Sequence, residues 1–184
     1  MDQIKIHQIK DPGDQYFNEF WRLYAESFPL NERRILRQQV AIFNNSAYRL
    51  NIYISGNHLI GFISFWMAEK FFFIEHLAIA SELRNRGKGK AVLKSFLESD
   101  HIPIILEIEP PVDNTTRNRL RFYKSCGFKL NHHTHSQPPY HNEDEPIPMK
   151  ILTYPAEIND SDYQQFATFQ KDIVLGPPRE IQSF

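Results

Sequence analysis

The spacing of apolar residues predicts one strand and two helices at the start of the chain. Polar and apolar side chains alternate with a period near two over residues 4–9, and the turn sequence DPG ends this stretch. Apolar side chains then recur at helical spacing over residues 16–28, which a proline follows, and the same spacing returns over residues 32–43. We therefore expect a strand and two helices in this region.

The next three apolar stretches predict an antiparallel meander. They cover residues 48–55, 59–68 and 71–80. Gly56 and Asn57 join the first two, and this pair tolerates the positive φ of a two-residue hairpin loop. The third stretch is apolar on both faces apart from Glu75 and His76, so we expect it at the centre of the sheet. In a regular strand these two side chains point to opposite faces.

Strands and helices alternate in the second half of the chain. The expected order is a helix ending near residue 100, a strand at 102–109, a helix at about 115–125, a strand at 128–130, a polar loop at 131–146, a strand at 147–154 and a helix at 162–173. A strand, a helix and a second strand joined by a crossover of this length form a right-handed parallel unit. The predicted fold is therefore α/β, with a mixed central sheet that begins as an antiparallel meander, continues as a parallel strand-helix-strand unit and is flanked by helices.

Length and composition favour one folded domain. The chain has 184 residues, of which 41% are hydrophobic, and its 15 Phe, 8 Tyr and 2 Trp supply more aromatic bulk than a disordered chain carries. We expect the domain to span residues 1–155. Residues 156–184 then form a C-terminal helix and tail, packed on or extending from the same domain.

Charge and cysteine content narrow the function classes. The formal net charge of −1 supplies no cationic field, so we expect no nucleic-acid partner. The single cysteine, Cys126, cannot form an internal disulfide or a four-cysteine zinc site, which favours a reducing compartment. No apolar block of the length of a signal peptide or a membrane span is present. We expect a cytoplasmic protein without membrane association.

Residues 86–91, RGKGKA, have the character of a phosphate-binding loop. They lie between the expected buried strand and the first turn of an amphipathic helix, where backbone amides lack intrahelical acceptors and the helix dipole is positive. The two glycines let an anion approach the backbone, and Arg84, Arg86, Lys88 and Lys90 add positive charge. The segment therefore predicts a site for a pyrophosphate.

Two familiar phosphate loops fit this segment poorly. A Walker A loop needs Ser or Thr after Gly-Lys, and neither Gly-Lys pair has one. The dinucleotide fingerprint needs a third glycine where Val92 stands and a turn directly at the strand end, although Glu107 lies about 20 residues downstream as that motif asks. The sequence therefore excludes a Walker A loop and matches the dinucleotide fingerprint only weakly.

A third pattern, Arg/Gln-x-x-Gly-x-Gly/Ala, is satisfied by residues 86–91 and resembles the pyrophosphate loop of the GNAT superfamily of acyl-CoA-dependent N-acetyltransferases. The strand sequence EHLAI at 75–79 resembles the central strand of that family, and LRFYKSCGF at 120–128 resembles its second motif. The resemblance covers most of residues 4–154. It implies a GNAT-like fold that binds acetyl-CoA and transfers the acetyl group to a primary amine by direct attack in a ternary complex.

The resemblance also implies residues that bind the cofactor. Backbone groups of Leu77, Ala78 and Ile79 would pair with the pantetheine arm, and Gly87, Lys88, Gly89, Lys90 and Ala91 would hold the pyrophosphate with Arg86 beside it. One position departs from the family pattern. Thr116 stands seven residues before the helix tyrosine, where the family often has Asn.

Acetyl transfer to an amine needs a base and a proton donor. Glu75, acting through a water with a pKa raised by partial burial, is the first candidate base, and Glu107 and Glu109 are in reserve. Tyr123, in the second motif, is the candidate acid. The structural alternatives are that Glu75 only pairs with a cation and that Tyr123 only packs in the core.

Acceptor contacts are expected from two connecting segments and one strand. Glu32 and Arg33 lie between the first two helices, Glu109 ends a strand, and Tyr140 lies in a loop expected to overhang the cleft. His132, His133, His135 and His141 share that loop. Without an HExxH motif or a cysteine partner they predict no functional metal site.

The acceptor is expected to be a small-molecule or peptide amine, and the protein a monomer or homodimer. Two alternatives remain open at this level. One is a non-catalytic acyl-CoA-binding sensor or interaction domain, in which Glu75 and Tyr123 are dispensable. The other is a nucleotide-binding protein of another class, for which ATP or NAD would compete with CoA.

Overall fold

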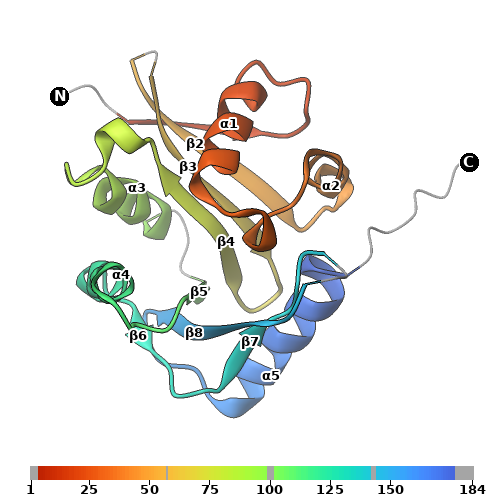
Figure 1. Ribbon diagram of the computed structural model, residues 1–184, viewed down its shortest axis with the longest axis vertical. Coiled ribbons are helices and arrows are strands. Elements are labelled where there is room, and N and C mark those ends of the chain that lie inside the picture. The colour runs from red at the N-terminus through yellow and green to blue at the C-terminus, as the bar shows by residue number, and fades with distance from the viewer. Residues whose placement is uncertain (1–3, 57, 99–101, 142–143, 177–184) are drawn as a thin grey trace, which may run out of the picture.

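The computed structural model describes residues 4–56, 58–98, 102–141 and 144–176 and contains one central sheet with helices on both faces (Figure 1). The strands are β1 (Lys5–Ile9), β2 (Tyr48–Ser55), β3 (His58–Met67), β4 (Phe72–Ile79), β5 (Ile104–Ile108), β6 (Lys129–Leu130), β7 (His135–Gln137) and β8 (Ile147–Tyr154). Their order is β1-β2-β3-β4-β5-β8-β6, and β7 pairs with β8. All pairs are antiparallel except β4 with β5.

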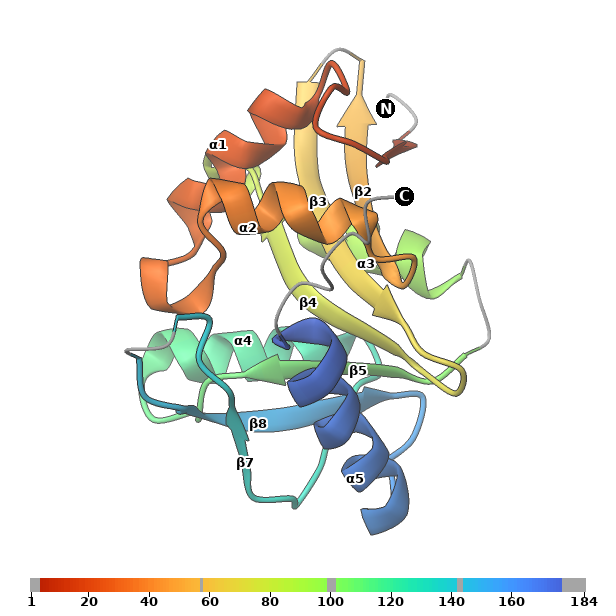
Figure 2. The ribbon, with the colours of Figure 1, turned by 90° about the vertical axis from the view of Figure 1, so that its right-hand side faces the viewer.

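The helices form two groups. They are α1 (Phe17–Ser27), α2 (Leu36–Ala41), α3 (Lys88–Leu97), α4 (Asn114–Ser125) and α5 (Asp160–Phe169), with short turns η1 (Leu30–Glu32), η2 (Ile42–Asn44), η3 (Ser81–Leu83) and the π-helical η4 (Gln170–Val174). In Figure 2, α1, α2 and α5 lie in front of the sheet and α3 and α4 behind it. None of the described helices is both long and apolar enough to cross a membrane.

Each face of the sheet has its own apolar core. Phe20 and Tyr24 of α1 and Phe166 of α5 belong to the front core. Leu93 of α3 and Tyr123 of α4 belong to the rear core. Burial of side chains of this size supplies the main driving force for folding, so α5 is part of the hydrophobic core and not an appendage.

The predicted α/β fold with a mixed sheet is confirmed, and the differences are local. The single helix expected over 32–43 is divided into η1, α2 and η2, because the backbone is extended at Arg33 and Ile35. The amide of Arg34 donates to the hydroxyl of Tyr24, at 3.0 Å, so the chain is held on α1 at this break. Of the loop expected over 131–146, residues 135–137 form β7. Asn57, the expected helix end at residue 100 and the tail at 177–184 lie outside the described residues.

A β-bulge in β4 changes the direction of two polar side chains. Ser64 of β3 pairs with His76, and the next residue, Phe65, pairs with Ile74, so Glu75 is an extra residue in β4. On either side of the bulge, Phe73 and Ala78 belong to the front core. A bulge re-aims the strand by one position, so Glu75 and His76 both face the front. The expectation that they point to opposite faces is wrong, because apolar alternation cannot reveal an inserted residue.

The parallel strands β4 and β5 separate part-way along their length, as Figure 2 shows. Their pairing ends at Ile74 and Leu106, although β4 continues to Ile79. The amide of Ala80 donates to a carbonyl of β3, at 2.9 Å. Because amides alternate in direction along a strand, those of Leu77 and Ile79 point away from β3, toward the gap left by β5.

Candidate functional site

A cleft of about 500 Å³ occupies the gap between β4 and β5. One end is formed by the loop that leads into α3, including Arg84, Asn85 and Gly87. The cleft is also lined by polar side chains of the segments around β4, β5 and β7, which are Glu32, Glu75, His76, Glu107, Glu109 and Gln137, together with Met149. The cleft therefore joins an anion-binding loop to a group of carboxylates.

The loop at the first end presents unpaired backbone amides. Gly87 has a φ of 72° and is the N-cap of α3, a conformation that disfavours a residue with a Cβ. The first helical hydrogen bond runs from the Ala91 amide to the Gly87 carbonyl, at 3.1 Å. Within the described part of the chain, the amides of Lys88, Gly89 and Lys90 have no protein acceptor. These donors at a helix N-terminus fit a pyrophosphate.

Glu75, which also lines the cleft, lies in a buried ion pair. Its Oε1 accepts hydrogen bonds from Arg34 at 2.6 Å and from the Tyr140 hydroxyl at 2.9 Å, and its Oε2 accepts one from Trp66 at 2.8 Å. The side chains of Arg34 and Glu75 are only 5% and 2% exposed. Burial acts to raise the pKa of Glu75, but the charge of Arg34 and the hydrogen bonds from Trp66 and Arg34 hold it below its usual value. The expectation of a raised pKa is wrong.

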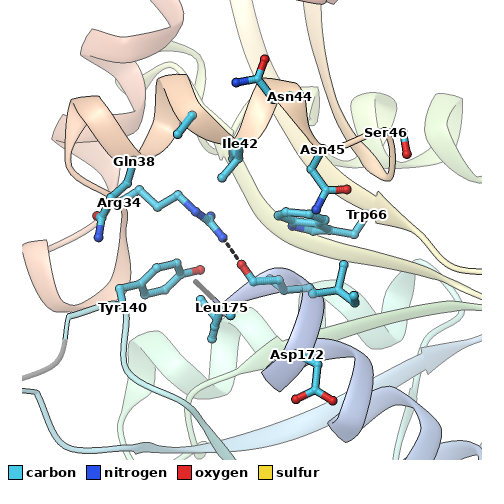
Figure 3. Close-up of a pocket in the computed structure, with 14 residues that line it drawn as sticks. Arg34, Gln38, Ile42, Asn44, Asn45, Ser46, Trp66, Tyr140, Asp172 and Leu175 are labelled. Carbon is cyan, nitrogen blue, oxygen red and sulfur yellow. Dashed lines mark hydrogen bonds between the residues drawn. The ribbon is translucent and has the colours of Figure 1, made fainter. Parts of the chain in front are cut away.

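Arg34 joins three distant parts of the chain. Its guanidinium donates hydrogen bonds to Glu75 and to the carbonyl of Val174, the latter at 2.6 Å. It also lies 5.6 Å from the ring centroid of Trp66 and 5.1 Å from that of Tyr140 (Figure 3). Although burial opposes its charge, Glu75 raises the pKa of Arg34. The sequence did not identify Arg34 as a site residue. Its only distinguishing local feature is the neighbouring Arg33, which does not indicate a buried ion pair.

His76 is held as a neutral imidazole. Its Nε2 donates to the Glu32 carbonyl at 3.0 Å, and its ring packs edge-on against Tyr24 and Phe28. Burial lowers the pKa of His76, although the charge of Glu75 opposes this shift. The imidazole is uncharged near neutral pH as a result.

Glu107 is a second buried carboxylate in the cleft, with its side chain 5% exposed. Its Oε1 contacts Nε2 of His135, and its Oε2 accepts a hydrogen bond from the Gln170 amide at 2.7 Å. Nδ1 of His135 lies 3.1 Å from the Tyr163 hydroxyl. Neither partner of Glu107 is a guanidinium or an ammonium, in contrast to the partner of Glu75.

Tyr123 lies on the opposite side of the cleft, on α4. It is almost completely buried but is one of the residues that line the cleft. Burial raises the pKa of Tyr123 to about 12. The phenol therefore keeps its proton throughout the neutral range.

Comparison with known proteins places the chain in a family. Residues 14–128 match the sequence profile of the Acetyltransferase (GNAT) family. A solved acetyltransferase of the GNAT family from Bacteroides thetaiotaomicron is 31% identical, covers 94% of this chain and 99% of its own, and superposes with a TM-score of 0.88. The chain belongs to the GNAT family of acetyltransferases.

More distant structures share the fold of this GNAT acetyltransferase. A family member from Elizabethkingia anophelis with acetyl-CoA bound is 18% identical, with 83% of this chain and 98% of that chain covered and a TM-score of 0.56. The ribosomal-protein-S18-alanine N-acetyltransferase of Escherichia coli is 15% identical, with 87% and 98% covered and a TM-score of 0.58. No curated protein sequence matches the chain.

The predicted cofactor residues of this acetyltransferase divide into two groups. Six of them line the cleft, namely Leu77, Ala78, Ile79, Gly87, Gly89 and Lys90. Arg86, Lys88 and Ala91 are not among the lining residues, and Arg86 is exposed. Arg84 and Asn85 also line the cleft, and Arg84 anchors the loop by donating to the Ile79 carbonyl at 2.9 Å. Thr116 is used in capping α4, where its amide donates to Asp113 at 2.8 Å.

Only some of the residues predicted to contact the acceptor line the cleft. Glu32 and Glu109 line the cleft, and Glu109 forms an ion pair with Arg119. Arg33 does not line it, because its side chain bonds to the Phe28 carbonyl at 3.0 Å and lies over Trp21. The hydroxyl of Tyr140 is used by Glu75, and a substrate contact from this residue stays a prediction.

The histidines of the 131–146 segment act in separate places. His141 Nε2 lies 3.0 Å from the Leu30 carbonyl and 3.1 Å from the Arg33 carbonyl, so the segment is fastened to η1. His132 and His133 meet Asp160, with the three potential ligand atoms within 4.8 Å of one another. His132 and Asp160 are exposed and His133 is buried, with its ring stacked on that of Tyr163 at 4.3 Å between centroids.

A second cavity of about 190 Å³ lies beside Arg34 (Figure 3). It is bounded by α2 and η2 on one side and by Ile173 and Leu175 on the other, with Trp66 and Tyr140 between them. The buried ion pair thus separates this cavity from the cleft.

The buried state of His76 predicts how stability depends on pH. Because its pKa is lower in the folded protein than the ordinary 6.5, the unfolded chain binds more protons below that pH, and the free energy of unfolding should fall as the pH drops from 7.5 to 5. Urea denaturation at several pH values measures this slope. We expect a flatter profile in His76→Gln and an unchanged one in His58→Gln, whose side chain is exposed. Equal slopes in all three proteins would contradict the prediction.

Proposed function

We propose that this GNAT acetyltransferase moves the acetyl group of acetyl-CoA to a primary amine by direct attack while both substrates are bound. The observation that carries the proposal is one continuous cleft with free backbone amides at one end and carboxylates at the other. Cys126, the one cysteine of the sequence, is not among the residues that line this cleft, so no thiol is placed to take the acetyl group first.

The residues present fit acetyl-CoA. The amides of Lys88, Gly89 and Lys90 would hold its pyrophosphate, and the amides of Leu77 and Ile79, directed into the gap beside β5, would hold its pantetheine arm and acyl carbonyl. When bound, acetyl-CoA supplies an acyl group activated as a thioester. The protein supplies the orientation, because the amides lie on a strand edge and a helix end that are fixed by the fold.

We assign the proton acceptor to Glu107 and a positioning role to Glu75. At pH 7.4 an ammonium with a pKa of about 10.4 is neutral in only about one molecule in a thousand, and an α-amine with a pKa of about 8 in about one in five. Even a neutral amine loses a proton when it forms the amide bond, so a base is needed. Arg34 keeps Glu75 ionised and weakly basic. Glu107 lines the same cleft, and among the described residues its side-chain partners are His135 and Gln170, not a lysine or an arginine. It can take the proton that the attacking amine loses.

Tyr123 supplies the proton for the departing sulfur. A free thiol has a pKa of about 8.5, against about 12 for this phenol. Proton transfer to a fully formed thiolate would be unfavourable by roughly 5 kcal/mol. Tyr123 therefore has to donate while the carbon–sulfur bond breaks, which requires its hydroxyl to lie in the cleft.

A screen of primary amines with thiol release as the readout tests the proposed function. We expect release with at least one amine class, and a rate at least tenfold lower in Tyr123→Phe with the affinity for CoA unchanged. Tyr154→Phe, a matched change outside the lining of the cleft, should behave as wild type. CoA binding without thiol release for any amine would contradict catalysis and favour a non-catalytic acyl-CoA-binding protein.

A further inference from the structure

Gln137 is a buried amide that the protein itself does not use. Its side chain lines the carboxylate end of the cleft, the residue is 7% exposed, and its Nε2 has no hydrogen-bond partner among the described residues. Buried polar groups of folded proteins are nearly always hydrogen-bonded. An unpaired amide in the wall of a binding cleft therefore indicates that the partner is a ligand.

Its neighbours on the same wall are already paired. His76 donates to the Glu32 carbonyl, and Glu107 contacts His135 and Gln170. Gln137 thus differs from His76 and Glu107. A substrate group that reached it would gain a hydrogen bond without breaking one in the protein.

The fold fixes where Gln137 stands relative to Glu107. His135 and Gln137 are alternate residues of β7, opposite Met149 and Ile147 of β8, so both side chains share one face of the strand. They are separated along the strand by about 7 Å. Pro138 follows directly and restricts the backbone at this point. Gln137 is therefore held at a set distance from the histidine that contacts Glu107.

A particular acceptor chemistry fits this pair of groups. In an α-aminoacyl group the carbonyl oxygen lies about 3 Å from the amine nitrogen. Such a group can place its amine at Glu107, which His135 contacts, and its carbonyl oxygen at the free amide of Gln137, two residues further along β7. Alkylamines and polyamines offer no carbonyl and leave Gln137 unpaired.

We propose that Gln137 recognises the carbonyl or amide group adjacent to the reacting amine, so that the acceptors are aminoacyl amides or peptide amino termini. This inference rests on the proposed acetyl transfer and names its substrate class. It makes Gln137 a specificity-determining residue that contacts the acceptor.

The test compares L-alaninamide with 3-methylbutan-2-amine, an amine of similar shape that lacks the amide. Because their amine pKa values differ, the informative quantity is the change in kcat/KM for each amine between wild type and Gln137→Met. We expect a loss of about tenfold for alaninamide, the worth of one hydrogen bond, and a change within about twofold for the alkylamine. The unchanged alkylamine rate also shows that the variant is folded.

Met149→Leu is the matched control, because it alters the same wall without touching a hydrogen bond. It should change both amines by the same factor. Equal losses for the two amines in Gln137→Met, or no loss for either, would overturn the inference while leaving acetyl transfer intact.

Failure of the proposed function has a different signature. If wild type acetylates neither amine, calorimetric titration of the CoA-loaded protein with alaninamide still tests whether Gln137 binds the acceptor. About tenfold weaker binding to Gln137→Met supports recognition by Gln137, and equal binding, or none to either protein, overturns it.

Discussion

Replacing Glu107 by Gln is expected to lower kcat/KM for the amine acceptor by a hundredfold or more near pH 7 and to leave the Kd for CoA within about twofold. The change preserves side-chain size but removes the carboxylate that we propose takes the amine proton, a contribution of roughly 10² to 10⁴ in rate. The deficit should shrink as the pH rises past the pKa of the acceptor amine, about 8 for an α-amine, because the amine then loses its proton to solvent. Thiol-release rates across this pH range measure both effects.

Two further variants complete the comparison. Glu157→Gln, which changes an exposed carboxylate outside the lining of the cleft, should match wild type. Glu75→Gln separates the two candidate bases. If it abolishes activity with CoA binding intact while Glu107→Gln retains a third or more of the wild-type rate, the base is Glu75 and the assignment made above is wrong.

Arg34→Met is expected to reduce the free energy of unfolding by about 3–5 kcal/mol, because it leaves the carboxylate of Glu75 buried without its cation. This is a large share of the roughly 5–15 kcal/mol that stabilises a typical domain. Urea denaturation at pH 7 gives the value. The double change Arg34→Met with Glu75→Gln should recover part of the loss, since no unpaired charge then remains.

The adjacent arginine supplies the control for this prediction. Arg33 bonds to carbonyls of its own segment and lies over Trp21 at the surface. Arg33→Met should cost less than about 1 kcal/mol. Similar costs for the two arginines would mean that the Arg34–Glu75 pair contributes nothing beyond a surface contact.

Local patterns of the sequence predict most of the fold. The apolar spacing of each stretch reports which of its faces is buried, so the meander and the parallel β4–β5 unit follow from it. The loop at 86–91 is also predictable, because glycines before an amphipathic helix have a direct physical meaning. These features depend on residues close together in the chain.

Contacts between residues far apart in the sequence cannot be predicted from local patterns. Arg34 meets Glu75, 41 positions away, and Val174, 140 positions away, and no local pattern records either contact. The bulge at Glu75 depends on how β3 pairs with β4, so it is invisible in β4 alone. The pKa of Glu75 was expected to rise through burial and falls instead, because the sequence did not reveal its guanidinium partner.

The hydrogen bond from Arg34 to Val174 bears on how the protein is made. A chain emerges from the ribosome N-terminal end first, at about 5–20 residues per second. Both members of the ion pair are then free to meet early, but the carbonyl of Val174 and the amide of Gln170 follow only near the end of synthesis. The side chains of Arg34 and Glu107 therefore gain their last hydrogen-bond partners several seconds after β4 and β5 have been synthesised.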